Sequence, residues 1–266
     1  MNVGIAGVGG RMGHALVRAI AEAGDLRLAA ATSRPGGTAV GMDAAALAGL
    51  PPCGVTVADD AGEFVACAAV IDFTTPAASA ALAPRLAAMG AAHVVGTTGF
   101  SPDEDGAIAD AAQRIAIVKS GNMSRGVTLL AALVADAARA LPDADVEVVE
   151  MHHRRKVDAP SGTALLLGEA AAAARGAPLG AVAVRGRDGQ TGPRPYGAVG
   201  FASLRGGTVV GEHDVVLALD GERIVLSHRA EERAIFARGA VAAARWTDGR
   251  PAGLYTMRDV LGLRSS

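Results

Sequence analysis

The chain has 266 residues, 50% of them hydrophobic, and a formal net charge of -2 at pH 7. This length allows one large domain or two modest domains, each with a buried core. Proteins that bind nucleic acid carry clustered basic residues, so this balanced charge predicts no such partner. The sequence has no basic leader and no apolar run long enough to span a bilayer, so we expect a cytoplasmic protein without a membrane partner that acts on small molecules.

Cysteine and lysine are both rare. Cys53 and Cys67 form no CxxC or Cys/His pattern, so neither a metal site nor a disulfide framework is predicted. Of the 25 basic residues only Lys119 and Lys156 are lysines, which marks both positions for inspection.

The first third alternates short apolar runs such as VGIAGVG, LRLAAATS, AAVIDFTTP and AHVVGTT with amphipathic or Ala-rich stretches. This rhythm predicts parallel βαβ units in a doubly wound, Rossmann-like sheet. From about Gly121 the pattern changes, and we expect an α+β domain with a mixed or antiparallel sheet. Its expected parts are helices at 127–140, 160–175 and 231–246, a mobile loop at 185–197, and strands in DVEVVEMHH, FASLRGG, TVVGEHDVVLALDG and RIVLSHRA.

A glycine-rich turn, GVGGRMG, follows the first predicted strand and opens a helix. Glycines here let the backbone approach a pyrophosphate, whose charge is then stabilised by N–H groups at the helix N-terminus. Met12 occupies the sixth position of the motif where a strict GxGxxG has glycine, so an ordinary turn is the alternative.

The end of the second strand, Ala31 to Arg34, has no carboxylate to bond a ribose 2′-hydroxyl. We therefore expect NADPH to be preferred, with Ser33 and Arg34 at its 2′-phosphate and NADH also possible. In the alternative, Arg34 is a solvated surface charge. Farther along, Thr98 of VVGTTGF is a candidate contact for the nicotinamide carboxamide, unless this segment is a plain turn capped by SPDE.

The most informative segment is MHHRRKVDAPSGTA, in which five basic or titratable residues follow an apolar strand. A helix-start signature comes next, with a capping residue, an early proline and small residues. A substrate carboxylate docked on this helix N-terminus would be neutralised by Lys156. His and Lys donate protons near neutral pH whereas Arg does not, so the segment suits a proton-coupled reduction. A solvated basic turn is the alternative.

Seven motifs spread along the chain are GVGGRMG, IDFTTP, GTTGF, GNMS, HHRRKVDAPSGTA, GFASLRGG and LYTMRDVL. They occur in the order and approximate spacing of the dihydrodipicolinate reductase family, so nearly the whole chain resembles that family. The resemblance implies NAD(P)H-dependent reduction of (hydroxy)dihydrodipicolinate, a cyclic imine dicarboxylate, to tetrahydrodipicolinate in diaminopimelate and lysine synthesis. It also implies a dinucleotide-binding domain of residues 1–121 plus 234–266. Residues 122–233 would then bind substrate and form a homotetramer.

Roles for individual residues follow from the same resemblance. His152 is expected to be the acid/base residue and Lys156 the proton donor. The expected substrate contacts are His153, Ser161, Gly162 and Thr163. The expected cofactor contacts, besides Ser33 and Arg34, are Gly7, Val8, Gly9, Gly10, Arg11, Met12, Phe73, Gly96, Thr97, Thr98, Ser120, Gly121, Asn122 and Met123.

Three departures from the family pattern stand out: Ser33 replaces a frequent acidic residue, Met123 a frequent Phe, and TGPR the usual TGER. Two other functions fit parts of the sequence. Another two-domain NAD(P) dehydrogenase, of aspartate or homoserine type, leaves HHRRKVDAPSGTA unexplained. A non-catalytic NAD(P)-binding sensor would use the basic cluster to contact a protein.

Overall fold

A computed structural model describes residues 1–263 of the chain. Unit 1 comprises Met1–Arg125 and the described residues from Ala234 onward, and unit 2 comprises Gly126–Arg233. Dinucleotide binding by residues 1–121 plus 234–266 stays a prediction, as do substrate binding and oligomerisation by residues 122–233. Residues 264–266 lie outside the described part. Across residues 1–263, no helix combines the length and the apolar character that crossing a membrane requires.

Unit 1 is built on a parallel sheet whose seven described strands run in the order β12-β6-β5-β4-β1-β2-β3. The strands are β1 (Asn2–Ala6), β2 (Arg27–Thr32), β3 (Val57–Ala58), β4 (Ala69–Asp72), β5 (Ala92–Val95), β6 (Ala116–Lys119) and β12 (Gly253–Tyr255). The helices are α1 (Arg11–Glu22), α2 (Ala44–Leu47), α3 (Pro76–Met89), α4 (Pro102–Ala112), α8 (Ala234–Trp246) and α9 (Met257–Val260), with a 3-10 turn η1 (Ala61–Ala66).

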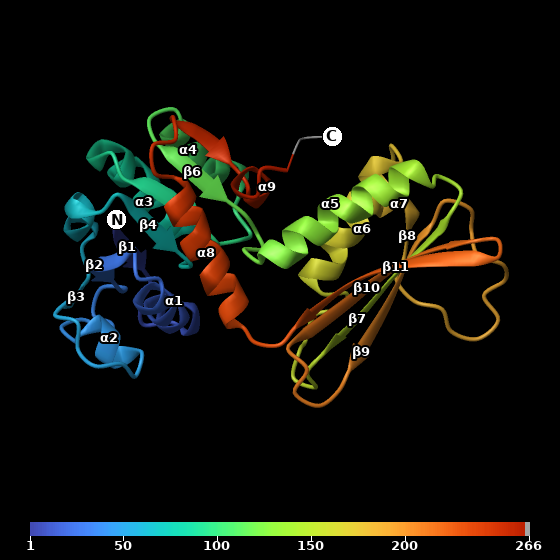
Figure 1. The fold of residues 1–266 in the computed structure, drawn as a ribbon, viewed down its shortest axis with the longest axis horizontal. Coiled ribbons are helices and arrows are strands. Elements are labelled where there is room, and N and C mark those ends of the chain that lie inside the picture. The colour runs from blue at the N-terminus through green and yellow to red at the C-terminus, as the bar shows by residue number, and fades with distance from the viewer. Residues whose placement is uncertain (264–266) are drawn as a thin grey trace. The chain divides into compact units, whose positions relative to one another are not determined.

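Helices cover both faces of this sheet, because successive strand residues point to opposite faces. Ile71 packs into a core shared with α1 and α8, whereas its neighbour Val70 packs into a second core shared with α3 and α4. In Figure 1, α1 and α8 accordingly lie on one face and α3 and α4 on the other. The sheet is doubly wound, as predicted.

Unit 2 has a mixed sheet whose described strands run in the order β11-β10-β7-β9-β8, with β7, β8 and β9 parallel and β10 antiparallel to its neighbours. The elements are α5 (Arg125–Ala140), β7 (Asp145–His152), α6 (Gly162–Ala174), α7 (Leu179–Val182), β8 (Ala183–Val184), β9 (Val199–Arg205), β10 (Gly211–Leu219) and β11 (Glu222–Ala230). Leu130 of α5 and Leu167 of α6 share a hydrophobic core with inward-facing Val148 and Val215. Figure 1 shows α5 and α6 beside this sheet. This confirms the predicted fold class.

Candidate active site

Two polar side chains continue the buried face of β7. Burial alternates along the strand, so that Val146 and Val148 face the core and Glu150 and His152 follow on the same side. Glu150 is 1% exposed and His152 is 9% exposed. Because buried charges need partners, the end of this strand must be stabilised by other polar groups of unit 2.

Glu150 is the hub of that network. Its carboxylate accepts hydrogen bonds from His152 Nδ1 at 2.5 Å, from Arg205 at 2.8 and 2.9 Å, and from the Ser161 backbone N–H at 3.2 Å. Burial alone would raise the pKa of Glu150, but the hydrogen bonds from Arg205 and His152 outweigh burial and lower the pKa to about 2. Glu150 is therefore an anion at every physiological pH.

The bond to Glu150 determines which nitrogen of His152 is available for chemistry. Since Nδ1 donates to the carboxylate, Nε2 is the nitrogen left to exchange a proton. A Cβ on Gly211 would lie 3.0 Å from this Nε2, so glycine there keeps space beside the nitrogen. Burial lowers the pKa of His152 and outweighs the opposite effect of Glu150, so the ring is mainly neutral near pH 7.

His213 supports the ring of His152 from β10. The two imidazoles meet edge to face, with centroids 5.2 Å apart, and His213 Nε2 shares a 3.0 Å hydrogen bond with Ser161 Oγ. Burial, reinforced by the nearby His152, lowers the pKa of His213 to about 4. His213 is therefore neutral and acts as an uncharged wall of the site.

Acidification is expected to lower the free energy of unfolding of unit 2. The folded pKa of His213, about 4, lies below its ordinary 6.5. The unfolded chain therefore binds the proton first, and stability falls from pH 6.5 to pH 4 by on the order of 3 kcal/mol. Glu150 also loses stabilising free energy as the pH falls, between its ordinary pKa of 4.5 and its folded pKa of about 2.

Urea unfolding from neutral pH to about pH 3 measures this decline. His213→Gln should make the step above pH 4 smaller, because glutamine does not titrate, while His152 and His228, whose pKa values are also lowered, keep part of the decline. A wild-type midpoint that stays constant between neutral pH and pH 4 would contradict the assignment of a neutral, buried His213.

Lys156 and His153 lie on the turn after β7. Lys156 Nζ contacts both carboxylate oxygens of Asp158 at 2.8 Å, and this pairing lowers the pKa of Asp158. Arg233 donates to His153 Nε2 at 3.0 Å, which makes that nitrogen an acceptor. Both side chains therefore have a partner before any substrate binds.

The next helix starts within the same cluster. Ser161 caps α6 by accepting from the Ala164 N–H at 3.2 Å, so α6 begins at Gly162 rather than near Pro160 as predicted. Gly162 is exposed and Thr163 half-buried at the first turn, where backbone N–H groups favour an anion. The structure thus joins His152 and Ser161 through Glu150, with Gly162 and Thr163 adjacent in the chain.

Three residues of this network were missed by the sequence analysis: Glu150, Arg205 and His213. Period-two alternation along VEVVEMH would have placed Glu150 on the inward face beside His152. No comparable signal existed for Arg205 and His213. They meet Glu150 only through the pairing of β7 with β9 and β10.

The glycine loop of unit 1 fits a pyrophosphate. Gly7 has a φ of +80°, and a Cβ on Gly13 would collide with the carbonyl oxygens of Gly7 and Val8. The N-cap of α1 is Gly10, and no side chain among residues 1–263 caps this helix, so its first N–H groups are available to an anion. Gly9, Gly10 and Arg11 are exposed, whereas Val8 is fully buried and would contribute only backbone.

The other predicted cofactor residues follow strands of the same sheet. Ser33 and Arg34 follow β2 and help to line a cavity of about 440 Å³, together with Gly7 and Thr74. Phe73 follows β4 and packs against Gly96. Met12, Ser120 and Asn122 are half-buried and Thr98 and Gly121 exposed, whereas Thr97 and Met123 are buried. Lys119, the second lysine, pairs with Asp105 and lies over the Phe100 ring.

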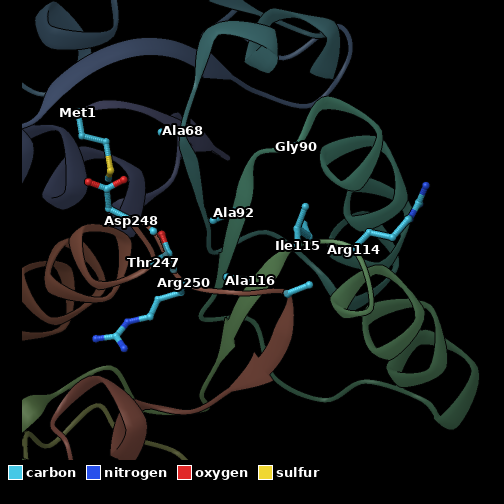
Figure 2. Close-up of a pocket in the computed structure, with 12 residues that line it drawn as sticks. Met1, Ala68, Gly90, Ala92, Arg114, Ile115, Ala116, Thr247, Asp248 and Arg250 are labelled. Carbon is cyan, nitrogen blue, oxygen red and sulfur yellow. The ribbon is translucent and has the colours of Figure 1, made fainter.

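A further cavity of about 290 Å³ lies at the N-terminal ends of the strands of this sheet, where β4, β5 and β6 begin. Figure 2 shows its lining, in which the heads of Arg114 and Arg250 extend away from one another and Asp248 lies toward Met1. Because no like charges converge there, this cavity lacks the character of an anion site.

Comparison with known proteins identifies the family. The model described as Dihydrodipicolinate reductase, N-terminus matches residues 1–123, and that described as Dihydrodipicolinate reductase, C-terminus matches residues 126–261. The 4-hydroxy-tetrahydrodipicolinate reductase of Allorhizobium ampelinum is 55% identical over 268 residues, covering 100% of this chain and 99% of the relative. For 4-hydroxy-tetrahydrodipicolinate reductase 1 of Mesorhizobium japonicum the identity is 56% over 266 residues, with 99% and 97% covered.

Among solved structures, dipicolinate-bound dihydrodipicolinate reductase from Paenisporosarcina sp. TG-14 aligns with a TM-score of 0.77. At 21% identity over 96% of this chain and 97% of that one, the likeness establishes the fold alone. Together with the two matched models and the full-length relatives, it confirms the resemblance: the chain belongs to the dihydrodipicolinate reductase family.

Proposed function

We propose that this chain is an NAD(P)H-dependent reductase that converts (hydroxy)dihydrodipicolinate to tetrahydrodipicolinate on the route to diaminopimelate and lysine. The observation that carries the proposal is the Glu150-oriented His152 beside a capped helix N-terminus, within the segment that holds Lys156. Relatives more than half identical over the full chain bear the same enzyme name.

The substrate is a ring with two carboxylates, and unit 2 offers groups of matching chemistry. One carboxylate is held by the first turn of α6, at Gly162 and Thr163, while Ser161 shapes this turn through its bonds to Glu150, His213 and Ala164. His153 and Lys156 supply the polar and cationic contacts for the ring and the other carboxylate. To contact the substrate, Lys156 must bind it alongside Asp158 or break its ion pair with Asp158. The exposed Asp158 carboxylate is then easily solvated by water.

The glycine loop and the segments after β2, β4, β5 and β6 would hold a nicotinamide cofactor, which would supply the hydride. Lys156 delivers the proton that balances the added charge, because its ammonium carries transferable protons while arginine keeps its own. His152 exchanges a proton or hydrogen bond at Nε2, with Glu150 fixing the tautomer.

A coupled assay tests the proposal. Pyruvate, aspartate semialdehyde and the preceding synthase generate the substrate, and cofactor absorbance reports its reduction. Oxidation of NADPH or NADH above the blank is expected. Absence of any oxidation, with the synthase shown to be active, would overturn the proposal.

NADPH is expected to bind more tightly than NADH, because the end of β2 presents Ser33 and Arg34 to the cavity and no carboxylate, while Asp59 of the same lining follows β3. Ser33→Glu should weaken NADPH binding at least tenfold by repelling the 2′-phosphate, and should improve NADH binding. Titration of both cofactors measures this. Arg27→Glu, at the other end of β2, is the control. Equal NADPH affinity in wild type and Ser33→Glu would refute the role of this position.

We also infer a homotetramer formed through the sheet of unit 2, in a cytoplasmic enzyme. On β11, the edge strand of this sheet, Ile224 is 41% exposed and Val225 is 47% exposed. Exposed apolar side chains on an edge strand favour association with another chain. Light scattering on the purified chain tests this assembly.

A further inference from the structure

A fully buried ionisable pair lies in the sheet of unit 1. Asp72, the last residue of β4, and His93, on the neighbouring strand β5, are both 0% exposed. His93 Nε2 lies 3.1 Å from Asp72 Oδ2. The proposed chemistry uses neither residue, and a pair buried without function would be costly to maintain.

The other oxygen of Asp72 organises the loop that follows β4. Asp72 Oδ1 accepts from the Thr74 backbone N–H at 2.8 Å and from Thr74 Oγ1 at 2.6 Å. Thr74 Oγ1 lies 3.3 Å from Ser79 Oγ on α3. Ser79 Oγ in turn donates to Thr97 Oγ1 at 3.0 Å, so this series of polar contacts reaches the loop after β5.

Packing links the same network to the glycine loop. A Cβ on Gly7 would come within 2.9 Å of the Thr74 methyl group, and the Phe73 ring fills the space beside Gly96. The three loops after β1, β4 and β5 therefore have interdependent positions. They carry the predicted cofactor contacts Gly7, Phe73 and Gly96 to Thr98.

We propose that Asp72, His93 and Ser79 are positioning residues that hold the loops after β4 and β5 in the geometry that binds the nicotinamide cofactor. They act through Thr74 and Thr97 and do not themselves touch the cofactor. This inference rests on the proposed function.

The charge state of the pair explains why both partners are needed. Burial would raise the pKa of Asp72, but the hydrogen bond and charge of His93 outweigh it and lower the pKa. Within residues 1–263, His93 Nδ1 has no hydrogen-bond partner, so the contact from Nε2 to Asp72 is the hydrogen bond that this ring makes. Without that donor, the buried carboxylate must draw on Thr74 and Ser79, and the loop shifts.

Binding measurements on four variants test the proposal, with NADPH as one probe and dipicolinate, measured without cofactor, as the other. Ser79→Ala breaks the link to Thr97 and should weaken NADPH binding about 3- to 10-fold. His93→Leu removes the donor and should weaken it at least tenfold, whereas His93→Gln, which keeps a donor, should restore it to within about threefold. Asp25→Asn removes an exposed pair with Arg245 in the same unit and should leave binding unchanged.

In each case the Kd of dipicolinate should stay within about twofold of wild type. Wild-type NADPH affinity in Ser79→Ala would overturn the inference, as would equal losses for both ligands. If His93→Leu does not fold, Ser79→Ala decides alone, since it leaves the Asp72–His93 pair intact. A wild-type chain that binds neither NADPH nor NADH would instead overturn the proposed function.

Discussion

Lys156→Ala is expected to lower kcat about 10²- to 10⁴-fold, because it removes the proposed proton donor from the turn after β7. Lys156→Arg should fail similarly, since a guanidinium keeps the charge but releases no proton near neutral pH. The affinity for NADPH should remain at the wild-type value in both variants. Steady-state kinetics with cofactor titration separates the two effects.

Arg155→Ala is the matched control, because Arg155 is an exposed cation one residue away. It should keep kcat within a few fold of wild type. If Arg155→Ala lost as much activity as Lys156→Ala, the basic cluster would act through bulk charge rather than proton transfer. Loss of binding to a protein partner, with no turnover in wild type, would favour the sensor function instead.

Glu150→Gln is expected to lower both stability and activity. The buried carboxylate neutralises Arg205 and orients His152, so its removal should cost about 3 kcal/mol of unfolding free energy. Loss of the oriented tautomer should reduce kcat/KM about 10²-fold. Since Glu150 raises the pKa of His152, the acid limb of the pH profile should move to lower pH.

Glu147→Gln is the control for this change. Glu147 lies on the other face of β7 and, like Glu150, forms ion pairs with arginine, in this case Arg187 and Arg194. Its loss should leave the acid limb where it is. An unchanged acid limb in Glu150→Gln would show that Glu150 does not govern the titration of His152.

Local patterns in the sequence predicted most of the fold. The alternation of apolar runs and helical stretches gave the doubly wound sheet, and SPDE gave the capping box of α4 at Ser101 and Glu104. Such signals act over a few residues, where propensity and capping dominate. The order of the strands in both sheets needed the structure, because pairing depends on contacts between distant segments.

The same limit applies to the site. His152, Lys156 and Ser161 were predicted because they share one short segment. His213 was not, since it reaches Ser161 and His152 only through the β7–β10 register. Asp72 and His93 were missed for the same reason, as no spacing rule reveals a pair buried between neighbouring parallel strands.

The return of the chain to unit 1 has a consequence for biosynthesis. Ala237, Ala240 and Val241 of α8 complete a core whose other members include Leu16 and Ile71, and β12 adds the last strand beside β6. In a nascent chain, the core of unit 1 therefore stays incomplete until the ribosome has translated the segment that follows unit 2. Unit 2, contiguous in sequence, can mature earlier. Chaperone demand during translation should therefore concentrate on the N-terminal half.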